Sequence, residues 1–239
     1  MNRLIMCGFY IMLMASCTQK QRLSSLQSKN LKEVNFVLSQ TKNMAHVIEE
    51  KLEKHRNKFP TGDIDQIDHV KVIIDYMYNF DQELRNLFIK DQNNKQLASA
   101  LKTLDLFHTQ QMKEILKVHG WIVVSKFGLK YDKKAWLLIQ HADEDPFFQA
   151  GVLCILEKMV NKKETDAKNY AYLYDRVAGK FHQIGFLQKY GTQVDFENEN
   201  IKLQPYEGSL EDIDNHRKAV GLEPLGDYLE KIKEISNGA

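Results

Sequence analysis

Three short segments in the second half of the chain concentrate residue types that can do acid–base or ligand-binding chemistry. Residues 140–146 read Gln-His-Ala-Asp-Glu-Asp-Pro, which places one imidazole and three carboxylates at a corner between two expected helices. An Asp-Arg pair follows at 175–176, and a Tyr-Gly-Thr-Gln run at 190–193. If the chain folds so that the three segments converge, they form a polar site.

Each segment offers a distinct chemical role. A carboxylate beside His141 would fix the imidazole tautomer and raise its basicity, so His141, Asp143 and Asp175 are the candidate catalytic residues. Arg176 can clamp a carboxylate or a phosphate with two parallel hydrogen bonds. The remaining polar side chains of these segments can hydrogen-bond a ligand, and with Arg176 they form the expected ligand-binding set: Gln140, Tyr190, Thr192 and Gln193.

A purely structural role is open for every one of these residues. His141 can be a satisfied histidine at a helix end, and Asp145 can be an N-cap, with Pro146 in the first helical position. Arg176 can tie down a loop as well as clamp a ligand. The sequence lacks the spacing of a zinc site and the motifs of nucleotide binding, so we expect no metal and no cofactor. Cys154 lies in an apolar helical stretch and is expected in the core.

The elements that must position these segments are expected to be helices. Apolar residues recur at helical spacing over 31–58, from about 63 to 93, and from about 95 to a helix end at Gly120. Further helices are expected from a cap at Asp132, from Asp145, from Thr165, and from a capping box that begins at Ser209. The pattern predicts an all-α protein of seven or eight helices in an irregular bundle, with one long loop or small hairpin near 180–208.

The N-terminus has the pattern of an export signal. One positive charge at Arg3 precedes an apolar run of about a dozen residues, and small residues precede Cys17. The run Met14-Ala-Ser-Cys17 resembles the lipobox of bacterial lipoproteins. That resemblance implies that Cys17 is lipidated with palmitate-type chains, and Thr18 after it matches the sorting pattern for the outer membrane, periplasmic side. We expect a signal peptide at 1–16, a tether at 17–30, a helical pair at 31–93 and a helical domain at 94–239.

Charge gives no reason to expect a nucleic-acid partner. The chain has 33 Lys and Arg against 32 Asp and Glu, and removal of a signal peptide with Arg3 would leave 32 against 32. A domain without net charge carries no basic field for a polyanion. We therefore expect membrane attachment through the lipid on Cys17 and, at most, a protein partner in the envelope.

The polar segments also resemble a bacterial family. Residues of about 95–230 resemble the uncharacterised family called domain of unknown function 6624, in which the runs Gln-His-Ala-Asp-x-Asp-Pro, Tyr-Leu-x-Asp-Arg and Tyr-Gly-Thr-Gln recur in this order. One departure is Ile122, where the family usually has Pro. The resemblance implies no established activity.

Two functions remain open from the sequence. The first is a binding or interaction module of the cell envelope with a polar pocket, whose N-terminal helices dock a partner. The second is a small-molecule or cell-wall-directed enzyme, hydrolase-like, with His141 as general base. The sequence leaves open whether the protein is an enzyme.

Overall fold

The computed structural model describes residues 45–197 and 200–237. The chain divides into two units, Met1–Lys51 and Leu52–Ala239, and each is described by itself. In the first unit, residues 45–51 are helical. The expected signal peptide, Cys17 and tether lie outside the described residues. No helix within the described ranges combines the length and the apolar character needed to cross a bilayer.

Two long helices open the second unit after a helical stretch that ends at residue 57. They are α2 (Ile67–Lys90) and α3 (Lys95–His119). The side chain of Asn94 accepts the backbone N–H of Leu97 and caps α3. Gly120 ends α3 with φ +68°, a conformation that an L side chain rarely adopts, so this expected helix end is confirmed.

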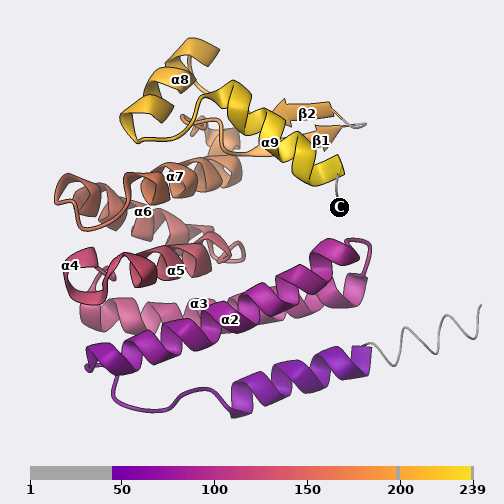
Figure 1. The fold of residues 1–239 in the computed structure, drawn as a ribbon, viewed down its shortest axis with the longest axis vertical. Coiled ribbons are helices and arrows are strands. Elements are labelled where there is room, and N and C mark those ends of the chain that lie inside the picture. The colour runs from indigo at the N-terminus through magenta and orange to yellow at the C-terminus, as the bar shows by residue number, and fades with distance from the viewer. Residues whose placement is uncertain (1–44, 198–199, 238–239) are drawn as a thin grey trace, which may run out of the picture. The chain divides into compact units, whose positions relative to one another are not determined.

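The next helices are α4 (Val124–Phe127) and α5 (Leu129–Gln140), shown in Figure 1. The expectation that Asp132 caps α5 is wrong, because α5 begins three residues earlier and Asp132 is fully buried within it. Its carboxylate accepts hydrogen bonds from Trp121 Nε1 and Thr165 Oγ1 at 2.7 Å each. Asp132 therefore joins the end of α3 to the turn before α7.

Two helices, α6 (Pro146–Asn161) and α7 (Ala167–Phe181), pack against each other. Asp145 caps α6 by accepting the N–H of Phe148, with Pro146 in its first turn, as expected. The cap of α7 is Asp166, one residue after the expected Thr165. Cys154 lies on the exposed side of α6, so its expected place in the core is wrong.

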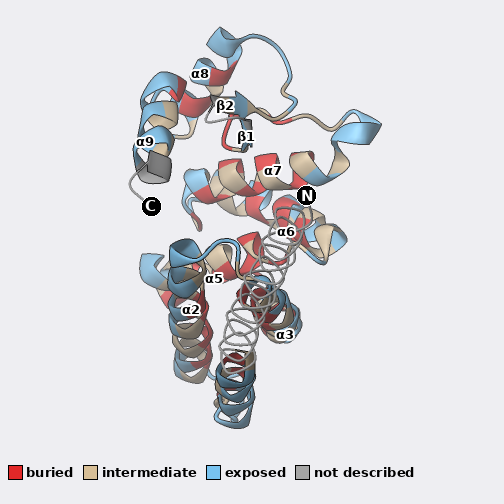
Figure 2. Ribbon diagram, turned by 90° about the vertical axis from the view of Figure 1, so that its right-hand side faces the viewer, coloured by how far each residue is buried: buried red, intermediate tan, exposed pale blue. Residues whose placement is uncertain are grey.

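One apolar core holds α2, α3, α5, α6 and α7 together. Figure 2 shows the buried stripes of these helices. Burial of large apolar side chains is the main source of stability for such a bundle. The core includes the following fully buried residues: Ile74, Met77, Met112, Ile115, Ile122, Ile139, Leu156 and Leu173.

The C-terminal part adds a short 3-10 turn, η1 (His182–Ile184), a hairpin and two helices. Strand β1 (Val194–Glu197) pairs antiparallel with β2 (Asn200–Leu203), with Val194 opposite Leu203. The helices are α8 (Leu210–Ala219), which begins with the expected Ser209–Asp212 capping box, and α9 (Leu225–Asn237). The fold is thus mostly helical with one small hairpin, which confirms the expected fold class.

Candidate functional site

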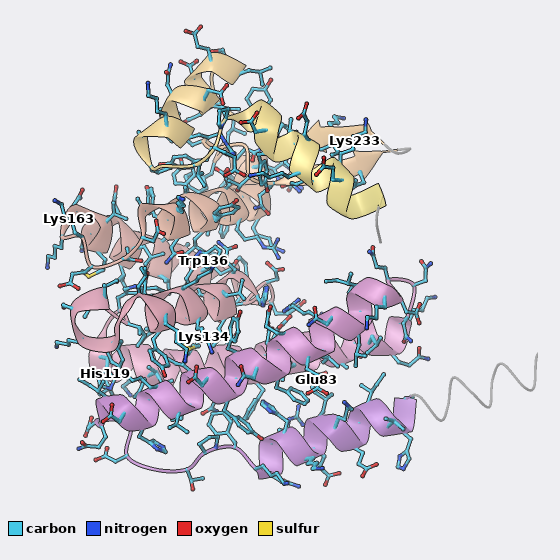
Figure 3. All side chains as sticks on the ribbon, in the orientation of Figure 1. Glu83, His119, Lys134, Trp136, Lys163 and Lys233 are labelled. Atoms are coloured by element: carbon cyan, nitrogen blue, oxygen red, sulfur yellow. The ribbon has the colours of Figure 1, made fainter. Side chains whose placement is uncertain are left out.

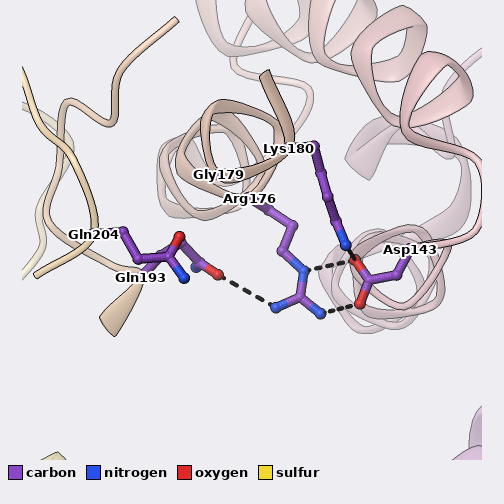
Figure 4. A pocket seen from close by; sticks show the side chains of 6 residues that line it. All are labelled: Asp143, Arg176, Gly179, Lys180, Gln193 and Gln204. Atoms are coloured by element: carbon purple, nitrogen blue, oxygen red, sulfur yellow. Dashed lines mark hydrogen bonds and ion pairs between the residues drawn. The ribbon is translucent and has the colours of Figure 1, made fainter. Parts of the chain in front are cut away.

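The first and second polar segments meet through an ion pair between Asp143 and Arg176. Arg176 lies in the last turns of α7, and Asp143 lies in the corner between α5 and α6. Arg176 Nε donates to Asp143 Oδ1 at 2.9 Å, and Arg176 Nη2 donates to Asp143 Oδ2 (Figure 4). Burial of Asp143 opposes ionisation, but Arg176 and Lys180 outweigh it and hold its pKa below the usual value. The carboxylate therefore stays charged and fixes the guanidinium.

The third segment joins this pair. Arg176 Nη1 donates to Gln193 Oε1 at 3.3 Å, and Lys180 Nζ lies 3.5 Å from Asp143 Oδ1. A pocket of about 160 Å³ opens beside these groups. Its lining is almost entirely polar and consists of Asp143, Arg176, Gly179, Lys180, Gln193 and Gln204.

Gly179 shapes this pocket. It sits inside α7, where glycine is about 1 kcal/mol less favourable than alanine. A Cβ added at Gly179 would lie 2.7 Å from Gln204 Oε1, so an alanine here would push the Gln204 side chain out of its place. The absent side chain leaves room for the Gln204 carboxamide against α7, and Gln204 Nε2 is anchored on Asp195 at 2.9 Å.

Asp175 does not face this pocket. Its fully buried carboxylate accepts backbone N–H groups of Lys189 at 2.7 Å, Tyr190 at 3.1 Å and Thr192 at 2.8 Å. Burial raises its pKa, and the hydrogen bonds from the backbone offset part of that increase. The geometry fits an anchor for the loop that carries Gln193, rather than a base beside His141.

Tyr190 and Thr192 are held in the same loop. The ring of Tyr190 is buried against Tyr170 and Tyr174, and its carbonyl accepts Arg217 Nη1 at 2.8 Å. The carbonyl of Thr192 accepts the hydroxyl of Tyr228 at 2.8 Å. Of the expected ligand-binding residues in this loop, Gln193 is the one that lines the pocket.

His141 contacts α2 instead of the Arg176 pocket. Its Nδ1 lies 3.0 Å from Asp81 Oδ1 and 2.9 Å from Arg85 Nε, and Arg85 Nε also donates to Asp81 Oδ1 at 3.0 Å. Burial of Asp81 raises its pKa, but its hydrogen bond and charge interactions with His141, followed by Arg85, lower it to about 2. His141 Nδ1 can donate a proton to Asp81 Oδ1 or accept the N–H of Arg85 Nε, but not both, so the tautomer of His141 decides which of the two contacts is its hydrogen bond.

Asp105 of α3 completes this cluster. Arg85 Nη2 donates to Asp105 Oδ1 at 2.5 Å, yet burial raises the pKa of Asp105 to about 6. Among the described residues, Asp81, Asp105 and His141 can bring ligand atoms within 4.8 Å of one another, as a metal site would. The Arg85 guanidinium donates to both carboxylates and lies 2.9 Å from His141 Nδ1, so Arg85 is the cation of the cluster in this structure.

Gln140 lies beneath the corner on α5. Its backbone carbonyl accepts Gln149 Nε2 at 3.2 Å, while its own Nε2 is buried without a partner. Trp136, which lies one turn earlier and is labelled in Figure 3, also buries its Nε1 without a partner. Its ring centroid lies 5.8 Å from that of Tyr172 of α7. Gln140 is therefore the last residue of α5, directly before the corner, and it does not line the pocket.

The three polar segments thus converge only in part. The structure joins Asp143, Arg176 and Gln193, and it directs His141 and Asp175 to different partners. The sequence analysis missed Gly179, Lys180 and Gln204 of the pocket, and it also missed Asp81, Arg85, Asp105 and Arg217. The spacing of Asp81 and Arg85, four residues apart on one helical face, is a signal that was available, whereas their pairing with His141 spans 56 to 60 residues.

The family model of DUF6624, a family of unknown function, matches residues 71–238. The chain belongs to the DUF6624 family. The match begins earlier than the resemblance at about 95–230, so the DUF6624 region includes Asp81, Arg85 and Asp105 as well as the Arg176 pocket. No curated protein and no solved structure matches the chain.

Proposed function

We propose that this protein is a binding module whose Arg176 pocket takes a small anionic ligand. The observation that carries the proposal is the charge of the pocket. Arg176 and Lys180 bring two positive charges and Asp143 brings one negative charge, which leaves one uncompensated positive charge beside neutral carboxamides. A partly desolvated cation attracts an anion more strongly than a cation in open water does.

The geometry of Arg176 supports the same conclusion. Asp143 occupies the Nε–Nη2 edge of the guanidinium, while Nη1 has only the 3.3 Å bond to Gln193. The Nη1–Nη2 edge keeps an N–H on each nitrogen, and this edge can hold a carboxylate with two hydrogen bonds. Asp143 therefore orients Arg176 for a ligand as well as neutralising part of its charge.

A substitution of Gly179 tests this function. Gly179→Ala fills the pocket from the helix side and displaces Gln204, while the helix itself gains stability. The matched control is Gly151→Ala in α6, where an added Cβ meets nothing within 4 Å. Binding of acetate and of inorganic phosphate is followed by NMR chemical shifts. We expect saturable shifts for the wild type and Gly151→Ala, and at least tenfold weaker binding for Gly179→Ala and Lys180→Ala. Equal binding by all four proteins, or none by the wild type, would contradict the proposal.

We also propose that the module is a lipoprotein of the cell envelope, anchored in the outer membrane on the periplasmic side. The support is the short apolar run that ends in Met14-Ala-Ser-Cys17. Full-length protein from membranes should have an intact mass that fits a chain beginning at an acylated Cys17, and Cys17→Ser should lose the acyl mass. An unmodified chain that still begins at Met1 would disprove this.

The Asp81–His141 pair favours a second candidate function, a hydrolase-like enzyme. In the tautomer in which Nδ1–H donates to Asp81, His141 has the arrangement of a general base, with Nε2 as the basic nitrogen. Hydrolysis of an ester and amide panel and of purified cell wall is measured for the wild type, His141→Ala and the exposed control His46→Ala. Activity that only His141→Ala removes supports an enzyme, and no activity in any protein favours the binding module alone.

A further inference from the structure

An apolar patch lies where α6 begins and α7 ends, close in the chain to Asp143 and Lys180 of the Arg176 pocket. We define it as Phe147 and Phe181, and Ile184 follows Phe181 in the short turn η1. Lys180, which lines the pocket, is followed directly by Phe181, and the ring of Phe181 lies 5.4 Å from that of Phe147. Phe147 is 77% exposed and Ile184 is 82% exposed, which are the two highest values among the large hydrophobic residues of the described part of the chain. Phe147 is thus a highly exposed ring beside a second, partly buried ring, and together they offer a ligand an apolar surface to cover.

The pocket itself is too small to enclose a whole organic ligand. Its volume is about 160 Å³, and sites that enclose drug-sized ligands measure roughly 300–1,000 Å³. Such a volume fits a carboxylate with a few attached atoms. The rest of the ligand must extend from the pocket across the neighbouring surface, where the apolar patch lies.

The pocket also offers amide groups beside its charge. The carboxamides of Gln193 and Gln204 face the same space as Arg176, and Gln204 Nε2 is held by Asp195 with its Oε1 directed at Gly179 (Figure 4). An amide oxygen held in this way is an acceptor for a peptide N–H. The terminal residue of a peptide carries a group for each of these features: a carboxylate for the cation, a backbone N–H for the amide oxygen and a side chain for the apolar patch.

We propose that the ligand is the C-terminus of a peptide whose last residue is aromatic or branched apolar. The inference deepens the proposed function and rests on it. The terminal carboxylate binds the Nη1–Nη2 edge of Arg176, and the nearby ammonium of Lys180 adds to the positive potential of the pocket. The last backbone N–H donates to Gln204, and the last side chain covers Phe147 and Phe181.

Three peptides test this specificity by isothermal titration calorimetry of the full chain. They are acetyl-Gly-Ala-Phe as the free acid, the same peptide as its C-terminal amide, and acetyl-Gly-Ala-Ser as the free acid. We expect the first to bind at least tenfold more tightly than either of the others. The C-terminal amide lacks the negative charge, so it loses a charge-assisted hydrogen bond, and the loss of one such bond weakens binding roughly tenfold or more. The peptide that ends in Ser loses the contact between its last side chain and the apolar patch.

Variants of the patch give an independent measurement. Phe147→Ser is on the surface and leaves the core intact, so it should weaken the Phe-ending peptide about fivefold or more and leave acetate binding unchanged. Leu129→Ser, at an exposed apolar position at the start of α5, is the control and should change neither.

The possible outcomes distinguish failure of the peptide inference from failure of the proposed anion-binding function. If acetate binds at the pocket but the Phe-ending acid binds no more tightly than acetate, the peptide inference is wrong and the anion site stands. If octanoate binds more tightly than any peptide, the ligand is a fatty anion and the peptide inference is likewise wrong. If acetate and all peptides fail to bind, the proposed function itself is contradicted.

Discussion

The Nδ1 atom of His141 lies 3.0 Å from the Oδ1 atom of Asp81, sixty residues earlier in the chain. Asp143, two residues after His141, is paired with Arg176 on α7. The corner between α5 and α6 is therefore fastened on one side to α2 and on the other to α7. Because the corner is held on both sides, the Asp143 carboxylate that lines the pocket has a fixed position.

Removal of the Asp81 charge should destabilise the fold. Asp81→Asn leaves Arg85 without one of its carboxylates in a buried setting, a loss that costs roughly 3 kcal/mol. Urea denaturation at neutral pH measures the change in the free energy of unfolding. Asp68→Asn, which removes a carboxylate that is 97% exposed and paired with Lys71, should change it little. Equal effects of the two substitutions would show that the Asp81 cluster is not a stabilising element.

Two buried histidines should make the fold sensitive to acid. His55 Nε2 lies 3.0 Å from His108 Nε2, and burial lowers their pKa values to about 4 and about 3. The unfolded chain binds protons near pH 6.5 and the folded chain does not, so stability is complete above pH 6.5 and is lost as the pH falls. By pH 4.5 the loss is roughly 2 kcal/mol for each histidine. Urea denaturation against pH measures it.

The control for this pair is a histidine in an exposed turn. His182→Gln should keep the acid sensitivity of the wild type, whereas His55→Gln combined with His108→Gln should remove most of it. A wild type whose stability does not change between pH 7 and 4.5 would contradict neutral buried histidines.

Asp105 should act in the opposite direction. Because burial raises its pKa to about 6, the folded chain holds a proton on Asp105 that the unfolded chain loses near pH 4. Its contribution to stability therefore decreases as the pH rises from about 4 to 6 and is constant above 6. The difference in unfolding free energy between wild type and Asp105→Asn, measured across this range, should change by roughly 2 kcal/mol. A constant difference would mean that Asp105 has an ordinary pKa.

Loss of the Asp175 carboxylate should release the loop that carries Gln193. Asp175→Asn replaces one of the two buried oxygens that accept three backbone N–H groups with an NH2 donor, which should cost about 2–3 kcal/mol. Hydrogen exchange should show the largest gain at the amides of 189–192. Asp195→Asn, at an exposed position on β1, is the control and should leave those amides protected. Unchanged exchange in Asp175→Asn would contradict the anchoring role.

Local signals predicted much of the fold. The caps at Asp145 and Ser209 and the helix end at Gly120 depend on a few consecutive residues, so the sequence alone was sufficient to place them. The sequence raised convergence of the three polar segments only as a condition for a site, and in the structure Asp143, Arg176 and Gln193 meet. The family patterns that marked these segments did not say which helix each side chain would face.

Long-range pairing explains what the sequence did not predict. Aspartate is a common residue at a helix N-cap, which is why Asp132 was expected there. Its hydrogen bonds instead come from groups up to 37 residues away: Trp121, Thr165, Asp166 and Asn169. Burial of such a carboxylate depends on tertiary packing and not on helix propensity. The prediction that Cys154 lies in the core was wrong because α6 packs through Val152, Leu153 and Leu156. Cys154 is therefore on the exposed face of this helix.

Selection for thermal stability and selection for ligand binding should favour different residues at position 179. In a screen for heat resistance, Gly179→Ala would be favoured, since it rigidifies α7 at a position where the backbone is already helical. The same change narrows the space beside Arg176. Libraries sorted first for thermostability should therefore lose glycine at 179, and libraries sorted for ligand capture should keep it.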